Sequence, residues 1–185
     1  MRNFDSGITD VLVTEAQIKQ RITELAETIN NDYANSAEPL ILVVLMKGAF
    51  IFAADLVRAI QLPVDLEFMI VSSYGDKVES SREVHIIQDI EEAIAGRNVI
   101  VIDDIIDTGL TLQKIMQLLE SRQPLSLKSC TLLDKAARRE TGLEADYVGF
   151  NISNQFVVGY GLDYAQNYRN IPYIGILNPE LISCC

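Results

Sequence analysis

The side chains best suited to chemistry are concentrated between residues 99 and 111, in the sequence VIVIDDIIDTGLT. A run of β-branched residues, which is typical of a strand, leads into two adjacent acids, Asp103 and Asp104. A short loop follows, and a helix is expected to begin at about Leu110. The candidates in the loop and the first helical turn are Asp107, Thr108, Gly109, Leu110 and Thr111.

A loop that opens a helix in this way favours the binding of an anion. Backbone N–H groups in the first turn of a helix are unpaired, and Gly109 allows an anion to approach the main chain closely. Thr108 and Thr111 add hydroxyl donors. Asp103 and Asp104 could accept hydrogen bonds from sugar hydroxyls, and Mg²⁺ is the natural mediator between such carboxylates and a phosphate. The segment therefore predicts a site for a phosphorylated sugar and a magnesium ion.

Simpler interpretations of the same residues compete with this one. Asp107 or Thr108 could serve only as the N-cap of the helix, since both residue types favour that position. Asp103 and Asp104 could be solvated acids of an acidic protein. DDIID also fits the DDxxD metal motif of isoprenoid synthases, but that motif needs a helix and NVIVI is a poor start for one. Those enzymes are also longer and all-helical, so we discount this alternative.

The chain as a whole is acidic, with 185 residues, 15 basic and 26 acidic side chains and a net charge of −11 at pH 7. The length suits one domain over residues 1–185, and an apolar content of 49% excludes wholesale disorder. The acidic balance argues against non-specific binding of nucleic acid. No apolar run approaches the ~20 residues that span a bilayer, and the first residues lack the apolar core of a signal peptide. We therefore expect a cytoplasmic protein that binds neither nucleic acid nor membranes.

Cysteine and histidine are too scarce for several common kinds of site. The three cysteines are Cys130, Cys184 and Cys185, and this odd count with two at the tail fits neither a disulfide framework nor a zinc site. His85 is the one histidine, which makes a multi-histidine metal site or an imidazole-centred triad improbable. We expect no catalytic role for His85.

Helices and strands alternate in the first half of the chain. Thr14 to Gln17 fit a capping box, and apolar residues at helical spacing follow, so a helix is expected over roughly 15–33. Residues 40–46 are seven consecutive apolar residues, which suits a strand covered on both faces. A mostly buried helix over 50–60 and a second strand over 64–71 come next.

The second half continues the alternation after a polar segment. Residues 72–82 predict a long exposed loop, and 84–87 a third strand. After the strand at 98–102, apolar side chains at helical spacing mark one face of a crossover helix, namely Leu112, Ile115, Met116 and Leu119. Further strands are expected over 127–133, 147–152, 156–158 and 173–177.

This alternation predicts an α/β fold with a mainly parallel central sheet flanked by helices. Open sheets of this kind bind ligands beyond the carboxyl ends of their strands. The residues just after Met46, Ile102 and Leu133 are therefore where we expect the site.

Residues 99–112 (VIVIDDIIDTGLTL) resemble the phosphoribosyl pyrophosphate signature of type I phosphoribosyltransferases. The resemblance extends from about residue 8 to residue 178 and is closest to bacterial hypoxanthine (hypoxanthine-guanine) phosphoribosyltransferases. Four further blocks occur in order, which are LVVLMKGAF, VSSYGD, LLDKAARR and QFVVGYGLDYAQNYRNIPYIG. One departure is that Asp103 stands where the family often has Glu, so this carboxylate is shorter by one methylene.

The resemblance implies a fold, a reaction and an assembly. The fold would be type I phosphoribosyltransferase-like, with a small hood region and a long flexible loop. The reaction would transfer the phosphoribosyl group from phosphoribosyl pyrophosphate to a 6-oxopurine, hypoxanthine or guanine, with Mg²⁺ and release of pyrophosphate. The protein would form homodimers or homotetramers.

The resemblance also implies roles for the acidic segment. Asp107, Thr108, Gly109, Leu110 and Thr111 would cradle the 5′-phosphate, with Asp107 also the general base for the purine nitrogen. Asp103 and Asp104 would hold the ribose hydroxyls. Asp104 and Asp163 would contact Mg²⁺, Asp163 at the pyrophosphate side, and Asp163 would also belong to the purine site.

Roles for other segments follow in the same way. Lys47 and Gly48 would bind pyrophosphate together with Arg169, whose fork geometry suits that task. Ser73 and Tyr74 would belong to a loop that closes over the reaction centre and excludes water. Taken without the family, the residues favour an ordinary turn with a solvated Lys47, and the sequence alone does not distinguish a closing loop from a plain surface loop.

The purine base would be read by three further residues. Lys135 would donate to the exocyclic oxygen of hypoxanthine or guanine, which disfavours adenine. Phe156 would stack on the purine, and Val157 would offer backbone contacts to its edge. From the residues alone, Lys135 could instead be a solvated lysine in a charged turn, and Phe156 a core residue.

Two hypotheses of other classes stay open. A regulatory protein could keep this fold and bind RNA or DNA, which would call for a local basic patch such as Lys128, Lys135, Arg138 and Arg139. A phospho-acceptor signalling domain also places acids and a lysine at strand ends, but there the acidic pair usually ends the first strand. We rank this last, because the pair here comes after residue 100.

Overall fold

A computed structural model describes residues 7–73 and 84–182 of the chain. In chain order the larger elements are β1 (Ile8–Val13), α1 (Glu15–Asp32), β2 (Leu40–Met46), α2 (Phe50–Ala59), β3 (Val64–Ser73), β4 (Val84–Gln88), β5 (Asn98–Ile106), α3 (Leu110–Glu120), β6 (Ser126–Asp134), β7 (Tyr147–Asn151), β8 (Val157–Val158) and β9 (Ile174–Leu177). A short 3-10 helix, η2 (Ala136–Arg138), follows β6, and a single helical turn, α4 (Pro179–Ile182), follows β9.

The centre of the molecule is a six-stranded sheet in the order β4-β3-β2-β5-β6-β7. β2 pairs in parallel with both β3 and β5, β5 pairs with β6, and β6 with β7, while β4 alone runs antiparallel. The expected α/β fold with a mainly parallel sheet is confirmed.

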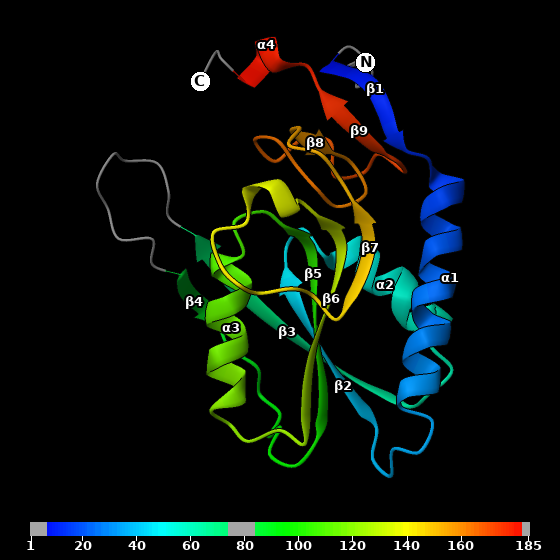
Figure 1. The fold of residues 1–185 in the computed structure, drawn as a ribbon, viewed down its shortest axis with the longest axis vertical. Coiled ribbons are helices and arrows are strands. Elements are labelled where there is room, and N and C mark those ends of the chain that lie inside the picture. Colours follow the sequence, from blue (N-terminus) through cyan, green and yellow to red (C-terminus); the bar gives the residue numbers. More distant parts are fainter. Residues whose placement is uncertain (1–6, 74–83, 183–185) are drawn as a thin grey trace.

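Helices cover both faces of this sheet, with α1 and α2 on one face and α3 on the other (Figure 1). Alternate residues of one strand therefore enter different cores. In β2, Leu42 and Val44 pack with the helices α1 and α2, whereas Ile41 and Val43 pack with α3. This two-sided burial explains why β2 is an unbroken apolar run rather than an alternating one.

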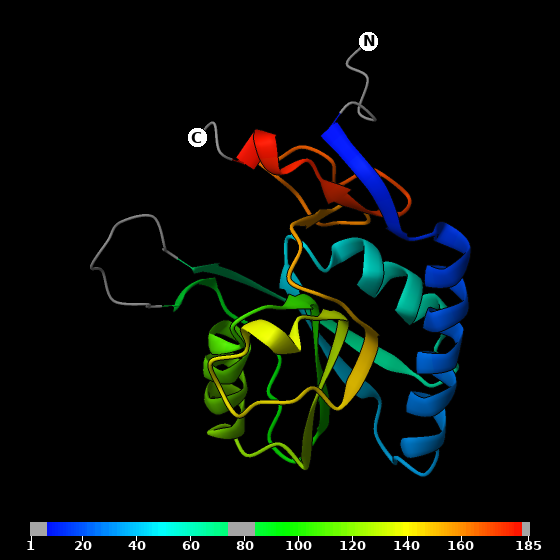
Figure 2. The ribbon, with the colours of Figure 1, turned by 45° about the horizontal axis from the view of Figure 1, so that its top comes forward.

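A second, three-stranded sheet stands over the carboxyl ends of the central strands (Figure 2). Its order is β1-β9-β8, and all its pairings are antiparallel, with Ile8 opposite Leu177. It forms the hood that the family resemblance implied. Our sequence analysis missed β1, because the strand alternates only weakly and its partner lies near the other end of the chain.

Most predicted boundaries agree with the structure within two residues. The Thr14 hydroxyl accepts a hydrogen bond from the Gln17 N–H, and the Gln17 side chain accepts one from the Thr14 N–H, so the capping box is confirmed. The strand predicted at 98–102 was too short, since β5 continues to Ile106 and carries both acids within it. The strand predicted at 156–158 was one residue too long, because Phe156 precedes β8.

The polar segment predicted as a loop over 72–82 needs a partial correction. Residues 72 and 73 belong to β3, and Ser73 pairs with Val84. Tyr74 and the rest of the expected loop lie outside the described residues. Within the described ranges, no helix is long and apolar enough to cross a membrane.

Candidate active site

The strand order creates a crevice between β2 and β5. The chain leaves β2 for β3 on one side and later returns to β5 on the other, so the loops beyond these two strands diverge. Crevices at such switch points are the usual ligand sites of open parallel sheets. Two of the predicted segments, 47–48 and 107–111, lie at these two carboxyl ends.

The acids at the end of β5 lie in a poorly solvated position. Asp103 Oδ1 accepts a hydrogen bond from the Asp104 N–H at 3.0 Å, and Asp104 Oδ1 accepts one from the Ile105 N–H at 3.0 Å. Burial raises the pKa of both carboxyl groups, and repulsion by Asp104 raises that of Asp103 further. This arrangement destabilises the negative charge, so it favours a site that receives hydroxyl donors or a cation.

The loop between β5 and α3 forms the expected cradle. Gly109 has φ of +84°, a left-handed conformation that suits glycine, and it stands at the N-cap position of α3. Thr108 Oγ1 accepts from the Leu110 N–H at 3.4 Å. A pocket of about 90 Å³ opens here, lined by Asp103, Ile105, Ile106, Asp107, Thr108, Gly109, Thr111 and Leu112. The interpretation of Asp107 or Thr108 as the N-cap is therefore wrong, because Gly109 holds that position without a side-chain cap and the Asp107 carboxylate contacts Arg138.

The segment after β6 packs along this loop. The Lys135 N–H donates to the Ile106 carbonyl at 2.9 Å, and the Glu140 N–H donates to the Thr108 carbonyl at 2.9 Å. Between these two contacts, Arg138 Nη1 lies 3.0 Å from Asp107 Oδ2. The two loops therefore form one unit at the edge of the site.

Lys135 is enclosed by this unit rather than solvated. Only 6% of the residue is exposed, which excludes the alternative of a surface lysine in a charged turn. Burial lowers the pKa of its ammonium group, although the negative charge of Asp107 opposes the shift. A largely enclosed lysine beside the cradle can donate hydrogen bonds to a bound ligand.

The loop after β2 lies directly against the acids of β5. The Met46–Lys47 peptide bond is cis. A Cβ built on Gly48 would lie 1.7 Å from Asp104 Oδ2, so a larger residue here would displace the Asp104 carboxylate or the loop. Lys47 is exposed. The structure thus brings together the two segments that we predicted to contact pyrophosphate and ribose.

The hood supplies the third side of the site. A Cβ on Gly161 would lie 2.2 Å from the Gly48 carbonyl oxygen, so the hood loop rests on the loop after β2. Arg169 Nη1 donates to the Gly161 carbonyl at 2.8 Å, and Arg169 Nη2 lies 2.7 Å from Asp163 Oδ1. The charge of Arg169 also lowers the pKa of Asp104, an effect smaller than that of burial.

Two hood residues predicted to read a purine have contrasting exposure. Phe156 is 40% exposed and is therefore not a core residue, and its ring meets that of Tyr164 edge-on with centroids 5.6 Å apart. Val157 is buried in β8, where it pairs with Ile176. Phe156 thus presents an aromatic face at the surface, while Val157 contributes backbone.

Sequence reasoning missed the contacts that cross between loops. Arg138 appeared only as part of a charged turn, and Asp134, which pairs with Arg139, was not singled out. Gly161 was likewise overlooked. The pair of arginines three and four residues after Lys135 was the available signal for the first of these.

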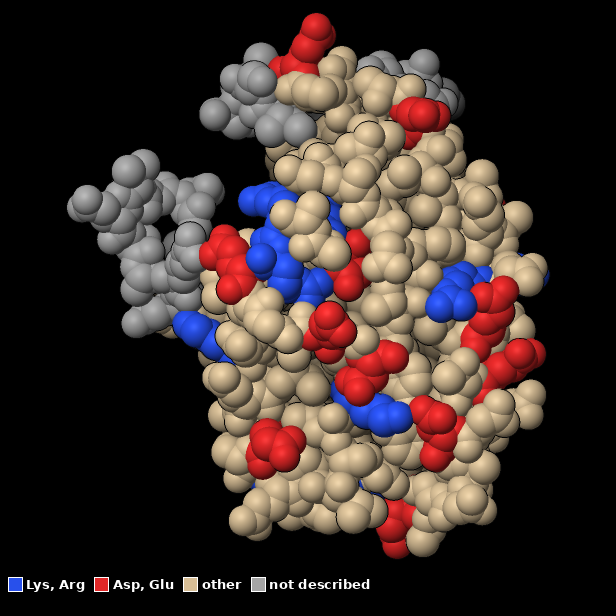
Figure 3. Space-filling view, viewed as in Figure 1, with Lys and Arg blue, Asp and Glu red and all other residues tan. Residues whose placement is uncertain are grey.

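Basic side chains gather at this site although the chain is acidic. Figure 3 shows Lys and Arg side chains clustered below the hood, next to η2, with acidic side chains around them. The rest of this face carries only scattered charges of both signs. The extended basic face that a nucleic-acid regulator would need is absent from this view of the described residues.

Comparisons with known proteins agree with one another. The model of the phosphoribosyl transferase domain matches residues 9–165. Hypoxanthine phosphoribosyltransferase of Salmonella typhimurium is 48% identical over 166 residues, which cover 90% of this chain and 93% of that protein. Hypoxanthine-guanine phosphoribosyltransferase of Mycobacterium bovis is 47% identical over 182 residues, which cover 96% and 90%.

Solved structures show the same similarity. Hypoxanthine phosphoribosyltransferase from Trypanosoma cruzi, in a ternary substrates complex, superposes with a TM-score of 0.90 at 41% identity, over 96% of this chain and 99% of the other. The agreement covers both the central sheet and the hood.

Proposed function

The chain belongs to the phosphoribosyl transferase family, and on this premise we propose that it is a purine salvage enzyme that transfers a pentosyl group. It moves the phosphoribosyl group from phosphoribosyl pyrophosphate to hypoxanthine, and to guanine as a second acceptor, and it releases pyrophosphate. The products are the corresponding purine nucleoside monophosphates.

One observation carries the proposal, which is the close association of three chemically different surfaces. The anion cradle of 107–111 adjoins Asp103, and the neighbouring Asp104 lies close to Gly48. A phosphorylated ribose with a second phosphate group needs such a row of hydrogen-bonding groups. The cradle donates to the first phosphate, the acids accept from the ribose hydroxyls, and the backbone at Gly48 donates to the second phosphate. Curated relatives at about half identity carry the same activity in their names.

The roles of the residues in substrate binding follow from this arrangement. The 5′-phosphate occupies the cradle at the start of α3, where N–H groups and the hydroxyls of Thr108 and Thr111 donate to it. Asp103 and Asp104 accept from the ribose hydroxyls. Lys47, the Gly48 backbone and Arg169 neutralise the growing charge of the leaving pyrophosphate.

The purine lies between the hood and Lys135. Phe156 stacks on it, Val157 offers its backbone to the base edge, and Lys135 donates to the exocyclic oxygen. As the bond from the purine nitrogen to the sugar carbon forms and the bond from that carbon to pyrophosphate breaks, Asp107 accepts the proton of the purine nitrogen. Adenine is rejected because its amino group would meet the donor of Lys135.

Magnesium fits this donor set. Mg²⁺ is usually held by one or two carboxylates together with substrate phosphates. The described residues contain no group of three or more acidic, histidine or cysteine side chains around one point, but Asp103 and Asp104 present adjacent carboxylates whose charge is destabilised. When bound, the ion would neutralise negative charge on the pyrophosphate group.

Asp163, the other proposed contact to Mg²⁺ and the purine site, is engaged in the protein alone. Its Oδ1 faces Arg169, and its Oδ2 accepts from the Gln166 N–H at 2.8 Å. Each of these oxygens keeps a second lone pair, so Asp163 can contact the ion while it holds Arg169 and Gln166.

We also propose a homodimer or homotetramer. Leu66 and Phe68 support this assignment, because they lie two residues apart on β3, project from the same face and remain 42% and 45% exposed. Light scattering on the purified protein measures the assembly.

We assign the enzyme to the cytoplasm, where the buried free thiol of Cys130 fits the reducing environment, and cell fractionation checks this.

A base-selection assay tests the function. The purified protein is mixed with phosphoribosyl pyrophosphate and Mg²⁺ and, in separate reactions, with hypoxanthine, guanine, xanthine or adenine. We expect rapid nucleotide formation with hypoxanthine and guanine and none with adenine. A failure of every base would reject the salvage assignment, and binding of nucleic acid would be tested next.

A further inference from the structure

Two consecutive arginines next to the site make different contacts. Arg139 is almost buried, with 12% of its side chain exposed, and it donates to the Asp134 carboxylate and the Leu143 carbonyl. Arg138 keeps 47% of its side chain exposed and reaches across to Asp107. Arg139 therefore anchors its own loop, whereas Arg138 connects that loop to the proposed general base.

The two oxygens of Asp107 are in different situations. Oδ2 is 3.0 Å from Arg138 Nη1. Oδ1 is buried and has no hydrogen-bond partner among residues 7–73 and 84–182. Since the side chain as a whole is 37% exposed, the exposed part is on the Oδ2 side. The oxygen that a substrate can reach is thus the one that Arg138 holds.

The backbone fixes Arg138 in this position. Its N–H donates to the Lys135 carbonyl at 3.0 Å, and the contacts from Lys135 to Ile106 and from Glu140 to Thr108 bracket the arginine on both sides. These contacts hold the Arg138 main chain beside the loop that carries Asp107, within reach of the ion pair between the guanidinium and Oδ2. A carboxylate oxygen has two lone-pair positions, so Oδ2 can accept from Arg138 and from a substrate N–H together.

We propose that Arg138 is a positioning residue, which orients the Asp107 carboxylate so that Oδ2 faces the purine N–H. The inference rests on the proposed function and on Asp107 as the base. Without the guanidinium, no hydrogen bond or ion pair with the described residues restrains rotation of the carboxylate. A misplaced base slows proton transfer but leaves the phosphate cradle and the pyrophosphate contacts intact.

Four variants test this inference in a double-mutant cycle. Arg138→Met, Arg138→Lys, Asp107→Asn and the combination of Arg138→Met with Asp107→Asn are assayed with hypoxanthine and phosphoribosyl pyrophosphate. Arg122→Met is the matched control, because Arg122 also pairs with an aspartate, Asp89 at 2.5 Å, at a distance along the chain from the site. Thermal unfolding of each variant is measured in parallel.

The expected results are specific to positioning. Asp107→Asn lowers kcat by about 10²- to 10⁴-fold. Arg138→Met lowers kcat by about 10- to 100-fold with KM for phosphoribosyl pyrophosphate nearly unchanged. Arg138→Lys recovers part of the loss. In the Asp107→Asn background, Arg138→Met changes kcat by about twofold or less, because the residue acts through Asp107.

The outcomes distinguish a failure of the positioning role of Arg138 from a failure of the proposed enzyme function. Normal kcat in Arg138→Met, or an undiminished effect of this change in the Asp107→Asn background, would overturn the positioning role while the wild type remains active. A rise in KM alone would make Arg138 a substrate-binding residue and would also overturn it. A wild-type protein without nucleotide product would overturn the proposed function and, with it, this inference.

Discussion

At the carboxyl ends of the central strands, Asp103 and Asp104 lie side by side, and neither forms an ion pair within the described part of the chain. At the amino ends, Asp32 receives hydrogen bonds from both the Lys128 ammonium at 2.9 Å and the Tyr147 hydroxyl at 2.6 Å. The same residue type is thus left without a cation at one end of the sheet and fully paired at the other.

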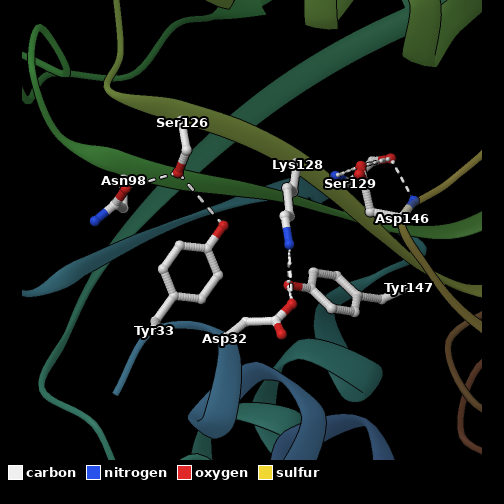
Figure 4. A network of polar contacts seen from close by, with 8 residues as sticks. All are labelled: Asp32, Tyr33, Asn98, Ser126, Lys128, Ser129, Asp146 and Tyr147. Carbon is white, nitrogen blue, oxygen red and sulfur yellow. Dashed lines mark hydrogen bonds and ion pairs between the residues drawn. The ribbon is translucent and has the colours of Figure 1, made fainter. Parts of the chain in front are cut away.

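The network at the amino ends connects α1 to β6 and β7 (Figure 4). Lys128 Nζ lies 5.6 Å from the centre of the Tyr33 ring and 5.0 Å from that of Tyr147, so the cation is flanked by two aromatic rings. Asp32 is the last residue of α1, where the helix dipole disfavours a negative charge. The ammonium group offsets this unfavourable position.

The pKa shifts at the two ends of the sheet have opposite effects on the charged forms of the side chains. Hydrogen bonds from Tyr147 and Lys128 lower the pKa of Asp32, and the bond to Asp32 raises the pKa of Lys128, so the charged forms are stabilised. At the site, burial raises the pKa of Asp103 and Asp104, so their charged forms are destabilised. The amino end therefore contributes to folding, while the carboxyl end keeps unsatisfied charge for ligands.

The largest of three further effects is expected from Gly48→Ala, which adds a methyl group where the loop after β2 approaches β5. In Gly48→Ala, the added Cβ would meet the Asp104 carboxylate, so either this carboxylate or the loop after β2 must move. We expect kcat/KM for phosphoribosyl pyrophosphate to fall by about 10²-fold. Gly142→Ala is the control, because a Cβ there meets nothing within 4 Å. Similar values of kcat/KM in the two variants would show that the close approach of Gly48 to Asp104 is not needed for activity.

A smaller effect is expected from one substitution made at both ends. Asp32→Asn removes a paired charge and should lower the free energy of unfolding by about 1 kcal/mol without changing kcat. Asp103→Asn removes one of two neighbouring carboxylates and should raise the free energy of unfolding by a similar amount while it lowers activity. Urea unfolding at pH 7 measures both. If both substitutions changed the free energy of unfolding in the same direction, the two ends of the sheet would not differ in the way proposed.

The smallest effect is the pH dependence of the amino-end network. Because the pKa of Asp32 is lowered in the folded protein, its contribution to stability is present above the unfolded value and is lost as pH falls through the folded value. The stability difference between wild type and Asp32→Asn should therefore shrink between about pH 5 and pH 2. Urea midpoints over this range check the sign, and a difference that grows in acid would contradict it.

Local sequence was sufficient for much of the fold. The capping box of Thr14 and Gln17 and the apolar run of β2 depend on neighbours in the chain, and both were predicted correctly. The end of β5 was not, because Asp103 and Asp104 are unusual strand residues and only the pairing with β6 keeps them extended. That pairing is a property of the sheet, not of the segment.

For the site, the sequence identified single segments but not how they meet. The family signature indicates Asp107 and the cradle, whereas the contact of Asp107 with Arg138 joins residues 31 positions apart. The approach of Gly161 to Gly48 crosses from the hood to the central sheet. Such contacts depend on how separate loops are folded against each other, and no local pattern encodes them.

The pairing of β1 with β9 has a consequence for the timing of synthesis. Ile8 leaves the ribosome long before its partner Leu177, and the hood that rests on Gly48 needs both strands. The central sheet from β2 to β7 contains none of these late residues and can assemble while translation continues. Each newly made molecule therefore gains its binding crevice in two stages, and stays inactive until β9 has emerged.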